Sequence, residues 1–307
     1  MKHFLKFVTL LTISIASTAV SLADTAVVDG ITWTYTVKDG EASIGGGSNS
    51  SIAVPKSTSG ALVIPSSLGV YPVTSISKWA FYGCTKMTSV TIPDSVTTIG
   101  ANAFDECRGL AEVTIPSSVT NIGTYAFGCC TGLATVNIAN LSAWCNILFN
   151  DRFANPIFYA KKLCVNGEMI SGDLRIPEGV KCIGGYAFCD YCGLTGLMMP
   201  NSVTNIGKGA FLNCSGLSDV TIPNSVKRIG ELAFWGCSGL TNVVIPNSVT
   251  WIGGSAFRDC GNLMRIELPF IGSERDADEY THFGYIFGAN SYSDNSKYVP
   301  ENLRVSI

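Results

Sequence analysis

The chain has 307 residues, with 20 basic and 23 acidic side chains and a formal net charge of −3. Only 14% of the residues are charged and 47% are apolar, which excludes an intrinsically disordered chain. The slightly acidic balance and the lack of a dense Lys/Arg cluster argue against nucleic acid as a partner.

The first 23 residues have the features of a secretory signal peptide. Lys2 and Lys6 form a basic start, residues 7–16 are an apolar stretch, and small residues lead to a cleavage site at Ala23. We expect cleavage after Ala23, so that the mature chain begins at Asp24. No stretch approaches the ~20 apolar residues of a transmembrane helix, so we expect no transmembrane segment.

Residues 24–60 precede the first repeat. Apolar and polar side chains alternate over residues 31–37, a Lys-Asp-Gly turn signal follows at 38–40, and residues 41–44 extend the pattern. This arrangement predicts a β-hairpin, which we expect to cap the first coil of the repeat. The polar residues 48–59 are expected to form a loop.

Residues 61–270 contain a repeat of 23 residues. Prolines mark the period, and they stand at Pro93, Pro116, Pro177, Pro200, Pro223, Pro246 and Pro269. An Ala-Phe pair recurs in step with the prolines, and in most coils a cysteine follows the phenylalanine by three residues. An enlarged, irregular unit at residues 139–176 interrupts the series.

Each repeat predicts one coil of a solenoid. Apolar residues alternate over 217–222, and Pro223 ends this short strand because proline has no N–H to donate. Gly230 suits a tight turn, and residues 231–237 fit about two turns of helix with Phe234 in the core. Coils stacked about 4.8 Å apart bury each other's apolar faces. We therefore expect an α/β solenoid with a parallel β-sheet on one face and short helices on the other.

Residues 271–307 form a C-terminal segment that leaves the period, and residues 303–307 resemble one further repeat strand. An acidic cluster lies in this segment, at Glu274, Asp276, Asp278 and Glu279. The cluster lacks the glycine and the spacing of an EF-hand loop, so we expect a solvated loop and no metal site.

The repeat pattern C-x-G-L-x-x-V-x-I-P-x-S-V-x-x-I-G-x-x-A-F resembles that of the BspA-like leucine-rich repeat family of secreted and surface proteins. The resemblance covers residues 61–269. It implies a right-handed leucine-rich repeat arc that serves adhesion and partner binding, often in host-associated bacteria.

The chain contains twelve cysteines. One cysteine per coil at a fixed position predicts a ladder of buried free thiols, because parallel Cβ vectors do not favour a disulfide. These repeat cysteines are Cys84, Cys107, Cys130, Cys214, Cys237 and Cys260. Cys189 and Cys192 form a CxxC pair without a second pair to complete a zinc site. The connectivity of any disulfide among Cys145, Cys164, Cys182, Cys189 and Cys192 stays open.

Catalytic chemistry has few candidate residues. His282 is the only histidine of the mature chain, and we expect it at the surface of a polar segment. No G-x-S-x-G nucleophile motif occurs. We expect neither an enzyme nor a bound cofactor or metal, and a carbohydrate-active enzyme that uses two carboxylates remains an alternative.

The outward positions of the repeat strands form the candidate ligand-binding surface, which we call the strand face. Its candidate residues are Thr91, Glu112, Thr114, Asp219, Thr221, Asn242, Arg265 and Glu267. Alternatively, these polar side chains only keep the sheet soluble. The enlarged unit adds five aromatic residues that either fill a local core or form a second contact loop: Trp144, Phe149, Phe153, Phe158 and Tyr159.

These features favour a secreted or cell-surface, non-enzymatic binding or adhesion protein. We expect it to recognise an extracellular protein or glycan through the strand face. The alternative is a structural or spacer module of a longer secreted protein.

Overall fold

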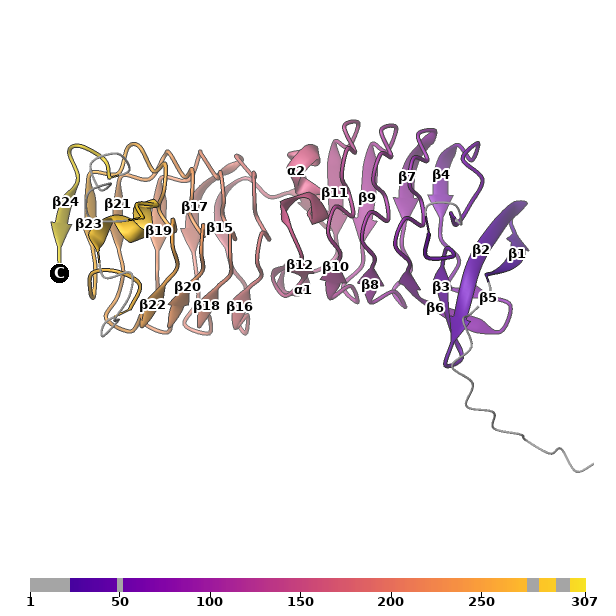
Figure 1. The fold of residues 1–307 in the computed structure, drawn as a ribbon, viewed down its shortest axis with the longest axis horizontal. Helices are drawn as coiled ribbons and strands as arrows, with labels where there is room; N and C mark the ends of the chain where they lie inside the picture. The colour runs from indigo at the N-terminus through magenta and orange to yellow at the C-terminus, as the bar shows by residue number, and fades with distance from the viewer. Residues whose placement is uncertain (1–22, 49–51, 275–281, 291–298) are drawn as a thin grey trace, which may run out of the picture.

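The structure is a computed structural model that describes residues 23–48, 52–274, 282–290 and 299–307. In Figure 1 the coils stand side by side along the long axis of the molecule, with strands β1 and β2 at one end and β24 at the other. The expected signal peptide lies outside the described residues except for Ala23.

The first wall of the solenoid consists of the strands that the repeat predicts. Its N-terminal sheet contains the parallel strands β4 (Gly60–Val63), β7 (Met87–Thr91), β9 (Glu112–Ile115), β11 (Thr135–Ile138) and β13 (Leu163–Val165), and ends with the antiparallel β14 (Glu168–Met169). Its C-terminal part contains β15 (Gly172–Arg175), β17 (Leu194–Met198), β19 (Asp219–Thr221), β21 (Asn242–Val244), β23 (Arg265–Glu267) and β24 (Arg304–Ser306).

A second wall of parallel strands, all of two residues except β6, runs along another side of the coils. It contains β6 (Tyr71–Ile76), β8 (Thr98–Ile99), β10 (Asn121–Ile122) and β12 (Leu148–Phe149) in one half, and β16 (Cys182–Ile183), β18 (Asn205–Ile206), β20 (Arg228–Ile229) and β22 (Trp251–Ile252) in the other. The sequence predicted only the first wall. Each of the two-residue strands of this wall follows the proline turn and precedes the repeat glycine, except β12, which follows the helical segment 141–145 and precedes Asn150.

The expectation of short helices on the far face is wrong for the repeat coils. Residues 231–237 form turns, with Leu232 and Gly236 in the left-handed region at φ of 59° and 73°. Alternate N–H groups bond to the next coil, and the N–H of Phe234 reaches the carbonyl of Ala256 at 2.8 Å. A helix is about 10 Å wide and would satisfy these donors internally, so it does not fit coils spaced about 4.8 Å apart.

Among the described residues, α-helices occur only in the enlarged unit. They are α1 (Leu141–Cys145) and α2 (Ile157–Ala160), joined by a 3-10 turn at Arg152–Ala154. The Asn140 side chain caps α1 by accepting from the N–H of Ala143 at 3.1 Å.

The core contains two ladders of stacked phenylalanines, one on each side of the enlarged unit. Phe104 lies between Phe81 and Phe127, with ring centroids 4.9 and 5.1 Å apart. Gly230 is required by close contact with the preceding coil and not by a left-handed turn, because a Cβ there would lie 2.5 Å from the backbone of Gly207. The repeat therefore fixes both the interior and the distance between coils.

At the N-terminal end, β1 (Asp24–Val28), β2 (Ile31–Lys38) and β3 (Glu41–Ile44) pair antiparallel, and β3 pairs parallel with β6. β5 (Ser67–Leu68) folds back on β6. Trp33 of β2 is buried, and its ring meets the Phe81 ring edge-on at 6.3 Å.

The C-terminal segment rebuilds the coil pattern without keeping the repeat sequence. The N–H of Ile252 donates to the Ser273 carbonyl at 2.8 Å, and the N–H of Phe257 donates to the Ile286 carbonyl at 2.8 Å. A 3-10 turn at Phe283–Phe287 stands where a repeat would place its Ala-Phe turn, and β24 completes the first wall. Most of the acidic cluster, at Asp276, Asp278 and Glu279, lies outside the described residues.

Candidate ligand-binding surface

Along the strands that carry the candidate residues, buried and solvent-facing side chains alternate. Val113 of β9 and Val220 of β19 are buried, while their neighbours Glu112 and Asp219 are exposed. All eight candidate residues of the strand face are exposed or half-buried. This alternation follows from the period-2 geometry of a strand whose other face forms the core.

In the N-terminal half, the strand face brings together three of the candidates. Pairing of β7 with β9 sets Thr91 beside Thr114. Asn137 of the neighbouring β11 donates a side-chain hydrogen bond to the carboxylate of Glu112. The resulting surface consists of hydroxyl and amide groups around a single negative charge.

In the C-terminal half, the strand face carries charges of both signs. Asn242 pairs in register with Arg265, which forms an ion pair with Glu267 on the same strand. A shallow cleft of about 580 Å³ lies over this pair and is also lined by Val244 and Ile307. Val244 is 52% exposed, so the cleft offers an apolar contact beside a charged pair.

The enlarged unit divides the strand face into two parts. The N-terminal sheet ends at β14, and β15 begins a new sheet. Thr91, Glu112 and Thr114 therefore belong to one sheet, and the other five candidates lie beyond the interruption. We expected the eight residues to share one surface, but the structure does not bring the two groups together.

The aromatic residues of the enlarged unit form a local core more than a contact loop. Trp144 and Phe149 are 1% and 2% exposed and cannot meet a ligand from solvent. The Phe153 ring stacks on Tyr125 at 4.8 Å, and the Phe158 ring packs edge-on against Phe153 at 5.0 Å. The hypothesis of a contact loop is therefore wrong for Trp144 and Phe149, while the partly exposed rings remain candidates.

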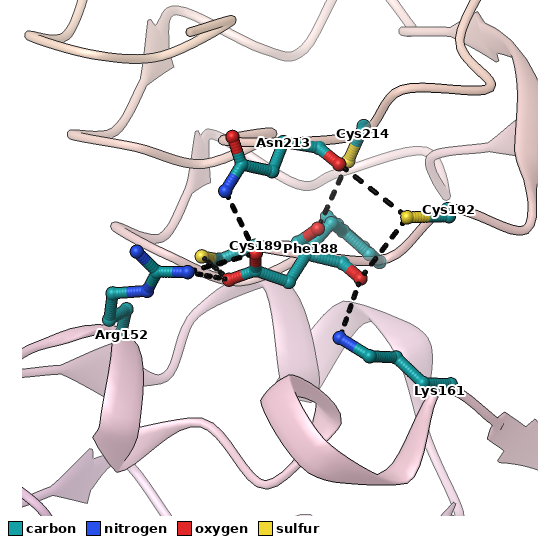
Figure 2. Close-up of polar contacts among 8 residues, drawn as sticks. Arg152, Lys161, Phe188, Cys189, Cys192, Asn213 and Cys214 are labelled. Atoms are coloured by element: carbon teal, nitrogen blue, oxygen red, sulfur yellow. Dashed lines mark hydrogen bonds and ion pairs between the residues drawn. The ribbon is translucent and has the colours of Figure 1, made fainter. Parts of the chain in front are cut away.

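A buried carboxylate joins the enlarged unit to the next coil. Asp190 is 7% exposed, and its oxygens accept hydrogen bonds from Arg152 at 3.0 Å and from Asn213 at 2.9 Å. Figure 2 shows the side chains of Arg152, Lys161 and Asn213 converging from both sides of this junction. Lys161 donates to the Asp190 carbonyl at 3.4 Å. Side-chain contacts thus replace part of the backbone ladder where the sheets are interrupted.

The cysteines form the ladder that their spacing predicts, and all twelve are free thiols in the structure. The Cys107 thiol donates to the Phe81 carbonyl of the preceding coil at 3.0 Å, and Cys237 makes the same contact to Phe211 at 3.1 Å. Burial raises the pKa of the Cys84 thiol to about 11 and that of Cys260 to about 12. These groups are therefore neutral core side chains at neutral pH.

The expectation of a surface histidine is wrong. His282 is only 6% exposed, precedes the 3-10 turn of the C-terminal segment and packs edge-on against the Tyr285 ring at 6.2 Å. Among the described residues, no group of three His, Cys, Asp or Glu side chains is placed to hold a metal ion. Within the same residues, no helix has the length and apolar character needed to cross a membrane.

Coils of 23 residues with parallel strands, each strand ended by a proline and each coil adding a phenylalanine to the core, define a leucine-rich repeat solenoid. The family model for the BspA type leucine rich repeat region matches residues 62–156 and 167–275 in six copies. The chain therefore belongs to the BspA-type leucine-rich repeat family.

Several solved structures are similar to this chain. A leucine-rich repeat protein of Treponema pallidum shares 26% identity, with 81% of this chain and 89% of that chain covered and a TM-score of 0.39. A leucine-rich cell surface protein of Faecalibacterium prausnitzii shares 21%, with 92% and 99% covered and a TM-score of 0.36. The pneumococcal vaccine antigen PcpA shares 17%, with 94% and 99% covered and a TM-score of 0.39. No curated protein matches the chain.

Proposed function

We propose that this chain is an exported, non-enzymatic binding or adhesion protein that recognises an extracellular protein or glycan through the strand face. The observation that carries the proposal is the separation of roles within each coil. Buried positions repeat the same residues, as at Phe104 and Phe211, while exposed strand positions change from Glu112 to Asp219 to Arg265. A scaffold that fixes its core and varies one face is suited to recognition.

The chemistry of the strand face fits a partner that is bound through many moderate contacts. Thr91, Thr114 and Thr221 offer hydroxyls, and Asn242 offers both a donor and an acceptor. Because charges of both signs lie near Arg265, long-range electrostatic attraction of a partner is weak. Affinity therefore depends on the number of contacts and on multivalent binding. Membership of a repeat family without catalytic machinery supports a role that involves no turnover.

We further propose that the N-terminal hairpin caps the solenoid. The buried Trp33 ring covers the end of the phenylalanine ladder at Phe81, which would otherwise face solvent. Replacing Trp33 by alanine should lower the unfolding free energy and increase self-association, as measured by urea denaturation and light scattering. A variant that is as stable and as monomeric as the wild type would argue against the cap.

Export is tested by mass spectrometry of the protein recovered from the medium or the cell surface. We expect a mature N-terminus at Asp24. Protein that retains Met1 and stays inside the cell would contradict the proposed location.

Binding is tested by screening the mature protein against immobilised extracellular matrix proteins and glycans. We expect at least one reproducible ligand and no change in its covalent structure after prolonged incubation. If the screen yields no ligand, the spacer role takes the place of the binding role. Cleavage of a glycan on the array would instead favour a carbohydrate-active enzyme.

A further inference from the structure

The second wall carries a group of four exposed cations in the C-terminal half. Lys181, Lys208, Lys227 and Arg228 lie on or beside the short strands β16, β18 and β20, and all four are exposed. We call these four residues the basic wall.

Strand pairing aligns the basic wall along the axis of the stack. Cys182 pairs in register with Asn205, and Asn205 with Arg228. Lys181 and Lys227 directly precede the first and last of these positions. They therefore stand two coils apart, at about 10 Å for a coil spacing of about 4.8 Å. The cations thus line a strip that runs from coil to coil.

An aromatic ring lies at one end of this strip. The Arg228 guanidinium stacks over the Trp251 ring at 4.2 Å. A shallow cleft of about 470 Å³ is lined by both residues together with Asn205 and Lys208. Stacking on the indole holds the Arg228 guanidinium in place. Among the described residues no carboxylate forms an ion pair with Arg228, so its N–H groups are available to an anionic ligand.

The carboxylates near the basic wall neutralise only part of its charge. Glu231 forms an ion pair with Lys208 at 2.8 Å, and Glu274 lies beside Trp251 through a β-bridge. Lys181 and Lys227 are paired with no carboxylate among the described residues. Among the described residues, the four cations of the basic wall are thus accompanied by two carboxylates, on a chain whose net charge is −3.

The N-terminal half shows that the fold does not require these cations. At the positions that correspond to Lys227 and Arg228, its coils carry Thr97 with Thr98 and Thr120 with Asn121. Uncharged residues thus build the same short strands β8 and β10. Lys208 has a counterpart in Lys78 beside β6, so only the cations at the positions of Lys227 and Arg228 are particular to the C-terminal half.

We propose that the basic wall binds a linear anionic polysaccharide whose carboxylate or sulfate groups contact Lys181, Lys227 and Arg228. An extended polyanion that lies along the stack can meet successive coils with successive sugar units. The edge of the Trp251 ring and the amide of Asn205 provide the apolar and hydrogen-bonding contacts that a sugar ring uses. Nucleic acid is the less favoured polyanion because so few cations would neutralise its backbone.

The test measures binding of the mature protein to heparin and to polygalacturonate by surface plasmon resonance, with dextran as the neutral probe. The test variant carries Lys181→Gln, Lys227→Gln and Arg228→Gln. The matched control carries Lys38→Gln, Lys86→Gln and Arg108→Gln, which remove three exposed cations elsewhere. Circular dichroism and the thermal midpoint check that both variants are folded.

We expect the wild type and the control variant to bind at least one of the two polyanions in a salt-dependent manner. Neither should bind dextran. The test variant should bind about tenfold more weakly or not at all. Absence of binding to both polyanions, or equal losses in the two variants, would overturn the proposal. Tighter binding to single- or double-stranded DNA than to either glycan would identify a different class of partner and overturn it as well. These outcomes do not depend on the strand face, which every variant keeps intact.

Discussion

Replacing Phe211 by alanine should destabilise the protein by about 4 kcal/mol. The ring is fully buried and stacks between Phe188 and Phe234, at centroid distances of 5.4 and 5.5 Å. Losing its burial costs about 2–3 kcal/mol, and each lost ring contact costs about 0.5–1.5 kcal/mol more. The sum agrees with the 3–5 kcal/mol that is typical when a buried phenylalanine is truncated.

Urea denaturation followed by circular dichroism measures this loss, and the slope m shows whether the transition keeps its cooperativity. The control is Thr221→Ala, whose side chain is exposed on β19 and should cost less than about 0.5 kcal/mol. Equal losses from Phe211→Ala and Thr221→Ala would refute the assignment of core and surface in the coil.

Three further predictions concern the thiols and the junction. In native protein, a thiol reagent should react rapidly with the exposed Cys129 and Cys192, while denaturation without reductant should expose all twelve thiols; fewer reactive groups after denaturation would reveal disulfides. Because burial raises the pKa of Cys84 from 9.0 to about 11, the folded state keeps a proton that the unfolded chain loses. The contribution of such thiols to the free energy of unfolding should therefore be constant below pH 9 and fall as the pH rises toward 11. Urea midpoints that stay unchanged across this range would contradict the prediction. Arg152→Gln should destabilise the protein by about 2 kcal/mol because it leaves the buried Asp190 carboxylate without its cation; restoration by the further change Asp190→Asn would support this cause, and a neutral effect of Arg152→Gln would exclude it.

The sequence predicted the parts of the fold that depend on burial. Strict alternation around Val113 and Val220 marked the first wall, and the regular Ala-Phe pairs marked the ladder that includes Phe104 and Phe211. These features are readable because each coil must place the same apolar residues inside.

The sequence could not reveal features that depend on contacts between coils. A two-residue strand such as Arg228–Ile229 is too short to show alternation, so the second wall was not predicted. The Ala-Phe segments were interpreted as helices because the choice between a helix and a turn is made by bonds such as Phe234 to Ala256 in the next coil.

The candidate site was only partly predictable for the same reason. Exposure of Glu112 and Asp219 follows from strand alternation, but their separation follows from the sheet interruption at the enlarged unit. Trp144 is buried, and its indole N–H is satisfied by the Ala187 carbonyl at 2.9 Å, 43 residues away. No local pattern encodes such a contact.

The binding role of the strand face is tested most directly by comparing dissociation constants for a ligand found in the screen. One variant replaces four strand-face residues by alanine: Glu112, Asp219, Asn242 and Arg265. A control of the same charge composition replaces four exposed residues elsewhere by alanine: Asp94, Glu178, Asn201 and Lys38. We predict that the first variant binds at least about tenfold more weakly while the control binds like the wild type. Unchanged binding by the first variant, together with loss on deletion of the partly exposed residues Phe158 and Tyr159, would contradict the assignment of the strand face as the binding surface.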